Sequence, residues 1–173
     1  MIPKIQRILY ATDLSPNSAY AFRYAINSAV NHDAKLIILH AFESPGRKVR
    51  AQMEFYLDEE KRKEIFGERV SYALERIKKR LRDFSDKELK EYPKAEDRIE
   101  SIQVCEGFPA DMILEKANEL ECDAIVMGTH GKGIIANAFL GSVAKRVLRR
   151  TRKPVFIIPL PRGETEITVH DDI

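Results

Sequence analysis

Two short stretches of this 173-residue chain carry residue types that bind anions and hydroxyl groups. The first is Ala11-Thr12-Asp13, which follows an apolar run, and the second is the glycine-rich loop from Gly128 to Ser142. Glycines let backbone N–H groups converge on an anion, and a helix that begins after such a loop adds free N–H groups and a positive dipole end. Ser142 stands where that helix should begin, so it could cap the helix and donate its hydroxyl. The loop therefore predicts a phosphate site.

Two common phosphate motifs do not fit this loop. A Walker A loop requires Gly-Lys followed by Ser or Thr, but Gly133 follows Lys132. The spacing Gly131-x-Gly133-x-x-Ala136 matches a relaxed dinucleotide fingerprint. However, the acidic residue that should bind a ribose about twenty positions later is missing. We therefore interpret the dinucleotide match as accidental.

The elements that must position these loops alternate between strands and helices. Helical spacing of apolar residues predicts a helix opened by Ser15-Pro16, a long amphipathic helix ending near residue 84, and helices beginning near residues 109 and 142. Residues 91–97 are predicted to be a polar connection. Strands are predicted from the apolar runs at residues 4–11, 35–42, 99–105, 123–127 and 155–158. This order favours an α/β fold with a doubly wound parallel sheet, in which ligands bind beyond the carboxyl ends of the strands.

The glycine-rich loop also fits a more specific pattern. Gly128-x2-Gly131-x9-Gly141-Ser142 resembles the nucleotide-binding signature of the universal stress protein family, in its ATP-binding branch. The segments at residues 8–15, 39–41, 124–128 and 153–159 follow in the order of that family. The resemblance covers residues 1–160, which we expect to form a single nucleotide-binding domain.

The resemblance implies a five-stranded parallel sheet of order 3-2-1-4-5 with helices on both faces, similar to the adenine nucleotide alpha hydrolases. That order makes the first and fourth strands neighbours, so the two loops would meet. The implied ligand is ATP, with Mg²⁺ or Mn²⁺ held mainly by the phosphates and no metal ligand from the chain. Adenine would lie near Ala41, ribose near Asp13 and residues 127–128, and the phosphates on residues 131–132 and 141–143. The implied nucleotide-binding residues are Ala11, Thr12, Asp13, Ala41, Met127, Gly128, Thr129, His130, Gly131, Lys132, Gly141, Ser142 and Val143.

Several of these residues have a second interpretation. Asp13 could instead cap the first helix, in competition with Ser15. His130 is as well explained by an exposed loop position as by a phosphate or metal neighbour. His40 is either a polar residue at a strand end, which is the favoured interpretation, or a ligand-binding residue. The basic cluster at residues 145–153 has two possible explanations, a solvated helix end or a surface that binds nucleic acid. A formal net charge of +2 and the absence of interleaved aromatic residues disfavour nucleic acid.

Two segments depart from the pattern of the family. Residues 44–64 form a charged insertion that could shield the site or engage a partner, and residues 161–173 form a tail or an extra strand. The resemblance also implies a homodimer through the strand Val155–Ile158. The apolar runs are too short to span a membrane, and no signal peptide is recognisable. Cys105 and Cys122 lie at no chelating interval, so a structural zinc site is not expected. The chain has only these two cysteines, which fits a reducing compartment, so we expect a cytoplasmic protein.

Three functions are compatible with these residues. The favoured one is a universal-stress-type ATP-binding protein in which nucleotide occupancy acts as a switch in a stress response. The alternatives are a slow ATPase and a regulatory interaction module that binds another adenylate or a different ligand. Hydrolysis requires a positioned base and usually an Arg at the γ-phosphate. Only Asp13 and His130 are near, without an evident orienting partner, so we assign no catalytic residue.

Overall fold

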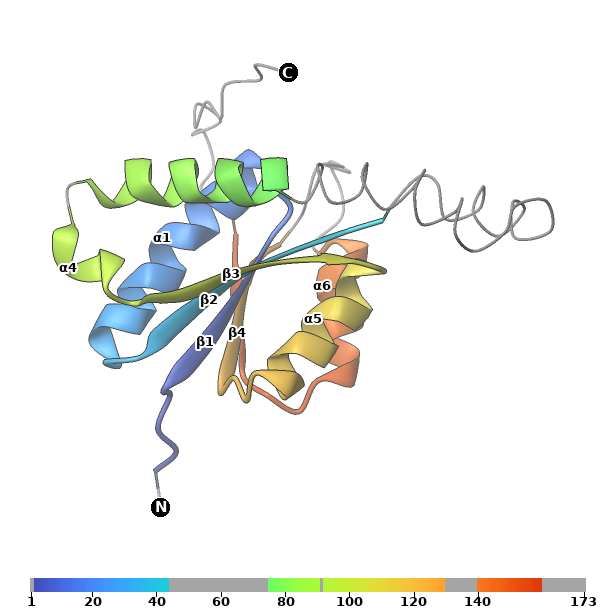
Figure 1. The fold of residues 1–173 in the computed structure, drawn as a ribbon. Helices are drawn as coiled ribbons and strands as arrows, with labels where there is room; N and C mark the ends of the chain where they lie inside the picture. The colour runs from blue at the N-terminus through green and yellow to red at the C-terminus, as the bar shows by residue number, and fades with distance from the viewer. Residues whose placement is uncertain (1, 44–74, 91, 130–139, 160–173) are drawn as a thin grey trace.

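The computed structural model describes residues 2–43, 75–90, 92–129 and 140–159. The predictions for the insertion 44–64, for residues 130–132 and for the tail 161–173 fall outside these ranges. Within the described ranges, strands and helices alternate along the chain as expected (Figure 1). Among the described residues, no helix is long and apolar enough to cross a membrane.

A five-stranded parallel sheet forms the centre of the molecule, with the order β3-β2-β1-β4-β5. The expected fold is therefore confirmed. Because β1 lies between β2 and β4, the carboxyl ends of β1 and β4 are neighbours at one edge of the sheet. The strand order reverses at this point. The strands are β1 (Arg7–Thr12), β2 (Lys35–Phe42), β3 (Ile99–Glu106), β4 (Ala124–Gly128) and β5 (Val155–Ile158).

Helices cover both faces of the sheet (Figure 1). On one face lie α1 (Pro16–Asn31), the helical residues 75–89 and the short α4 (Pro93–Glu96). On the other face lie α5 (Pro109–Glu119) and α6 (Ser142–Arg150). Alternate strand residues face the two layers, so Ile8 and Tyr10 pack under α1, whereas Leu9 and Ala11 pack under α5 and α6. This alternation decides which residues can reach a ligand on each face.

The structure corrects three of the predicted elements. β1 begins at Arg7 instead of residue 4, because pairing with β2 starts there and the amides of Gln6 and Arg7 donate instead to the Asp123 carboxylate at 2.8 and 2.9 Å. The amphipathic helix continues to residue 89, beyond the predicted end near residue 84. Residues 91–97, predicted as a connection, contain α4, which has a proline in its first turn.

Two helices end in the same way, with a non-glycine residue in the left-handed conformation. Asp33 (φ 55°) follows α1 and Glu121 (φ 50°) follows α5. In both cases the next amide closes the helix end: Ala34 donates to Ala29 at 2.8 Å, and Cys122 donates to Ala117 at 2.9 Å. These are Schellman motifs, in which glycine is the usual residue at the left-handed position.

Candidate functional site

A cavity of about 320 Å³ opens at the edge of the sheet where β1 and β4 end side by side. It lies on the α5 and α6 face, because Leu39 and Ala41 of β2 point to that layer and Ile113 of α5 forms part of the wall. Crevices at the reversal of strand order are where doubly wound sheets bind ligands. The topology therefore places this cavity at the position expected for a binding site.

The predicted site residues that the structure describes all line this cavity. They come from the ends of β1, β2 and β4 and from the start of α6: Ala11, Thr12, Asp13, Ala41, Met127, Gly128, Thr129, Gly141, Ser142 and Val143. His130, Gly131 and Lys132 fall outside the described residues. The structure thus brings together segments that are more than a hundred residues apart in the sequence.

Some lining residues were missed by the sequence analysis. Leu39 lies two positions before Ala41 on the same face of β2, so the strand period could have found it. Pro109 and Ile113 lie one helical turn apart on α5, where the sequence indicated only a helix start at Pro109 and an inward-facing Ile113. The complete list of missed residues is Ser18, Leu39, Pro109, Ile113 and Ala144.

The amino end of α6 opens on the cavity without a side-chain cap. The N-cap is Gly141 rather than Ser142, so the predicted capping role of Ser142 is wrong. The Gly141 amide donates to the Thr129 carbonyl at 2.7 Å, and the Gly141 backbone is extended (φ −67°, ψ 162°), as is usual at an N-cap. The first amides of a helix have no partner within it. Those of residues 142–144 are therefore donors at the cavity wall, with the positive end of the helix dipole behind them.

The turn after β1 presents the Asp13 carboxylate. Asp13 Oδ1 accepts from the amide of Ser15 at 3.1 Å and from its hydroxyl at 2.6 Å. Ser15 in turn accepts from the amide of Ser18 at 3.2 Å, which makes Ser15 the N-cap of α1, as predicted. The two interpretations of Asp13 are thereby resolved in part, since Asp13 holds the capping serine instead of capping the helix itself. Within the described structure, both hydrogen bonds to this carboxylate fall on Oδ1.

Thr12 holds the same turn through its hydroxyl. Thr12 Oγ1 donates to Ser18 Oγ at 2.9 Å and accepts from the amide of Leu14 at 3.1 Å. Leu14 adopts a left-handed conformation (φ 63°), which is uncommon for a leucine and is maintained only where neighbouring contacts impose it. Tyr10 also contributes to this network, because its phenol donates to the Ser18 carbonyl. Burial raises the pKa of the Tyr10 phenol.

His40 lies behind this turn. Its Nδ1 is 2.7 Å from the carbonyl oxygen of Thr12, and its ring stacks on Phe42 with centroids 6.4 Å apart. The side chain is 7% exposed and follows Ile38 on the α1 face, opposite to the cavity. His40 is therefore a buried polar residue at a strand end and does not line the cavity.

Gly128 ends β4 at a point of close approach. A Cβ atom at this position would lie 3.0 Å from Asn17 Nδ2 and 3.1 Å from Asn17 Cγ. Asn17 is itself buried in the first turn of α1. A methyl group here would be a tight contact, so the glycine leaves room for Asn17 where α1 packs against β4.

The described wall of the cavity is mostly uncharged. Of the described lining residues, Asp13 alone is ionisable. Across the described ranges, no group of three or more His, Cys, Asp or Glu side chains could hold a metal ion.

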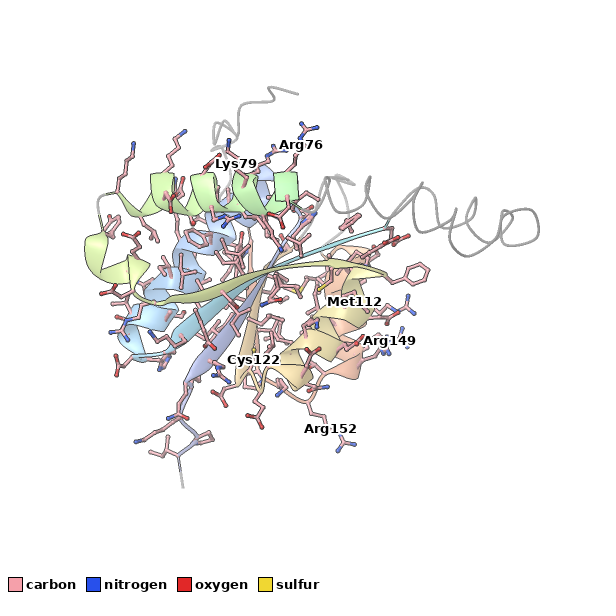
Figure 2. All side chains as sticks on the ribbon, in the orientation of Figure 1. Arg76, Lys79, Met112, Cys122, Arg149 and Arg152 are labelled. Carbon is pink, nitrogen blue, oxygen red and sulfur yellow. The ribbon has the colours of Figure 1, made fainter. Side chains whose placement is uncertain are left out.

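The basic cluster of residues 145–153 belongs to the outer surface of α6. Arg150 forms an ion pair with Asp111, and Arg146 Nε lies 3.9 Å from the same carboxylate. Figure 2 shows Arg149 and Arg152 pointing outward from α6 and from the segment after it. None of these side chains lines the cavity. The cluster therefore does not contribute to this site.

The fold is an α/β domain of the doubly wound class, with a cavity at the reversal of its strand order. The chain belongs to the universal stress protein family, whose family model matches residues 4–159. It is 32% identical over 160 residues to the universal stress protein MJ0531 of Methanocaldococcus jannaschii, covering 92% of this chain and 85% of that protein.

Two solved structures share the architecture. The structure of MJ0577, also from Methanocaldococcus jannaschii, has a TM-score of 0.61 and 25% identity, and covers 93% of this chain and 100% of that one. A universal stress protein in complex with cAMP has a TM-score of 0.56 and 26% identity, and covers 90% of this chain and 98% of that one. A relative of this chain therefore binds a cyclic adenylate.

Proposed function

We propose that this chain binds an adenine nucleotide, ATP with Mg²⁺ or Mn²⁺, in the cavity between β1 and β4. Occupancy of the site would be the signal that the protein contributes to a stress response. The observation that carries the proposal is the uncapped amino end of α6, which opens on a cavity at the reversal of strand order. The cAMP complex of a relative supports an adenine nucleotide as the ligand class.

The start of α6 would hold the phosphates. Ser142, Val143 and Ala144 line the cavity and supply the first amides of this helix. A hydrogen bond to a charged group contributes about 1.5–3 kcal/mol. Two or three such bonds would supply much of the ~8 kcal/mol that corresponds to micromolar affinity.

The opposite part of the cavity would hold the nucleoside. Leu39, Ala41 and Ile113 provide an apolar wall of the kind that binds a flat base. Asp13 accepts Ser15 through Oδ1, which leaves Oδ2 to accept a hydrogen bond from a ribose hydroxyl. A ligand with a base, a ribose and phosphates would thus find a matching surface along the cavity.

Binding is favoured over hydrolysis as the function. A phosphoryl-transfer site needs a group that orients water and a cation aimed at the γ-phosphate. Asp13 is the one ionisable lining residue within the described ranges, and its Oδ1 is already engaged. A slow ATPase activity is the alternative, and a regulatory module for another adenylate is the next.

We also propose that the protein is a cytoplasmic homodimer joined through β5. This strand is at the edge of the sheet, and Phe156 on it is 38% exposed. An exposed edge strand is a ready surface for pairing with a second chain. Cys105 and Cys122 are both free thiols, which favours a reducing compartment.

Calorimetric titration of the nucleotide-stripped protein tests the binding proposal. ATP with Mg²⁺ should bind more tightly than AMP or cAMP, because more phosphate oxygens reach the amides of α6. Gly141→Val should abolish binding while the far-UV circular dichroism stays unchanged, since the new side chain would block approach to these amides. Gly141→Ala is the matched smaller change and should reduce affinity less. Equal affinity of wild type and Gly141→Val would overturn the assignment of the phosphate end.

A further inference from the structure

We propose that the exposed face of α6 is a docking surface for an acidic segment of a partner protein. This surface, the basic face, consists of Lys145, Leu148, Arg149 and Arg152. None of these side chains lines the cavity, so the proposal goes beyond nucleotide binding and does not depend on it. The basic face is the part of the cluster at residues 145–153 whose cations the described structure leaves unpaired.

The basic face follows the spacing of a helix surface. Residues three and four positions apart are neighbours on a helix, so Leu148 and Arg149 both lie one turn after Lys145. All three side chains are exposed, Leu148 by 40%. Arg152 is exposed just beyond the end of α6, and Figure 2 shows it pointing outward, as Arg149 does. The surface therefore combines cations with an exposed apolar side chain.

The other cations of the cluster have partners inside the fold. Arg146 and Arg150 lie against the carboxylate of Asp111 on α5, and Lys153 Nζ donates to the Cys122 carbonyl at 2.7 Å. The three cations of the basic face form no ion pair with any residue of the described structure. The fold therefore uses one part of the cluster and leaves the other part available to a partner.

The stability of α6 does not explain these charges. Lys145 is in the first part of the helix, where a cation opposes the helix dipole, and the first turn contains no acidic residue to offset it. Lys145 and Arg149 are four positions apart, and like charges at that spacing destabilise a helix. Arg149 is favourable in the last turn, so the dipole accounts for one cation of the three. Carboxylates of a partner would remove the repulsion.

The chemistry of the basic face fits an acidic protein segment. Such a segment supplies carboxylates to the cations and an apolar side chain to Leu148. A polynucleotide also supplies anions, but the basic face has no aromatic side chain on which a base could stack. A second copy that presented the same face across a two-fold axis would set cations against cations. An acidic segment is therefore the occupant that satisfies both the charges and the leucine.

The first experiment measures binding of a labelled peptide to the full chain by fluorescence anisotropy at low salt. The peptide is an alanine-based helix that carries glutamates at positions i, i+4 and i+7, with a leucine beside the middle one. Wild type should bind this peptide, and rising salt should weaken the complex because exposed charges are screened. Absence of binding at low salt would overturn the inference.

Replacement of the three cations identifies the surface. The α6 variant combines Lys145→Gln, Arg149→Gln and Arg152→Gln, and should bind the peptide about tenfold more weakly, since three exposed ion pairs are lost. Glutamine has nearly the helix propensity of lysine and arginine, so the far-UV circular dichroism should not change. An α6 variant that is folded and binds the peptide as tightly as wild type would overturn the inference.

A control variant removes the same charges elsewhere. It combines Lys79→Gln, Arg80→Gln and Arg82→Gln, which are exposed cations of the helix at residues 75–89, on the opposite face of the sheet from α6. The control variant should bind the peptide about as tightly as wild type. Equal weakening in the control and α6 variants would show that the peptide responds to net charge alone, and would overturn the inference.

The apolar contact has its own test. Leu148→Ala should weaken binding of the leucine peptide about threefold, because less apolar surface is buried in the complex. It should not change binding of a second peptide that has alanine in place of that leucine. Val30→Ala alters a similarly exposed aliphatic residue of α1 and should affect neither peptide. Equal effects of Leu148→Ala on the two peptides would overturn the inference.

Other occupants of the basic face predict different results. A labelled single-stranded oligonucleotide of the same charge as the peptide should bind more weakly than the peptide. Equal or tighter binding of the oligonucleotide, lost in the α6 variant, would overturn the inference in favour of nucleic acid. Sedimentation of the protein alone should give wild type and the α6 variant the same mass. A lower mass for the α6 variant would assign the face to a second copy and overturn the inference.

The inference and the proposed function fail separately. A folded protein that binds the acidic peptide but no nucleotide would overturn the proposed function and support the docking surface. A protein that binds ATP but not the peptide would overturn the docking surface alone.

Discussion

The carboxylate of Asp13 accepts the hydroxyl of Ser15 at 2.6 Å, which joins the single ionisable group found in the described cavity wall to the N-cap of α1. Asp13 thus holds the capping residue and also lines the cavity. Ser15 closes the first turn of the helix through the amide of Ser18, and the same serine holds Asp13 at the mouth of the cavity. The start of α1 and the geometry of the candidate site therefore depend on one another.

Ser15→Ala should lower the free energy of unfolding by about 1 kcal/mol, the usual cost of losing an N-cap side chain. Urea denaturation monitored by circular dichroism measures this change. Ser28→Ala, within the same helix, is the matched control and should be near neutral, since alanine is the better helix former. Equal losses in the two variants would contradict a specific capping role for Ser15.

Gly128→Ala should destabilise the protein by about 1–3 kcal/mol, because the new Cβ would lie 3.0 Å from the buried side chain of Asn17. Thermal denaturation of Gly128→Ala, Asn17→Ala and the double variant measures the coupling. The double variant should lose less than the sum of the single losses, since shortening Asn17 makes room for the methyl group. Strict additivity would show that the two residues do not compete for the same space.

Glu121→Gly should raise the free energy of unfolding by about 1 kcal/mol, because Glu121 is held at φ 50° and a left-handed backbone costs about that much for a residue with a Cβ. The side chain is exposed and forms no ion pair within the described structure, so little is lost with it. Chemical denaturation checks the gain. Glu121→Ala keeps the Cβ and should not be stabilising, and a gain in that variant would point to the lost charge instead.

Cys122 should make stability fall at alkaline pH. Burial raises the pKa of this thiol to about 11, and in Figure 2 the side chain lies at the lower end of the sheet, beside the start of β4. In the unfolded chain the thiol ionises near its ordinary value of about 8.5. The folded state therefore binds more protons between the two values, and this contribution to stability is present below about pH 8.5 and is lost as the pH rises towards 11.

The test is urea denaturation of wild type and Cys122→Ala at several pH values from 8 to 11. The decline in stability across this window should be shallower in Cys122→Ala, with a remaining slope from Tyr10, whose pKa is also raised by burial. Cys105→Ala is the comparison variant and should change the slope less, because the Cys105 thiol is only partly buried. Parallel curves for wild type and Cys122→Ala would contradict the expectation.

Local chemistry made the helix starts predictable. Ser15-Pro16 predicted the beginning of α1 because serine accepts an amide and proline lacks one, and the structure confirms it. The end of the same helix carries no comparable signal. Asp33 is left-handed because Ala34 must turn into the core, where it is fully buried, and that demand comes from the sheet. Sequence reading was wrong about Ser142 for a similar reason, since the bond from Gly141 to Thr129 joins two segments across the loop.

The sequence by itself determined that strands alternate with helices, and that polar or glycine-rich loops follow β1 and β4. The spacing of hydrophobic residues and the positions of proline and glycine are local signals, so each element can be predicted from its own segment of sequence. Only the tertiary structure decided that Ile113 of α5 and Leu39 of β2 complete the wall of the cavity. It also placed His40 behind Thr12, on the face of the sheet that the cavity does not use. These relationships depend on strand order and on how helices pack across a sheet, and neither is encoded within a single segment.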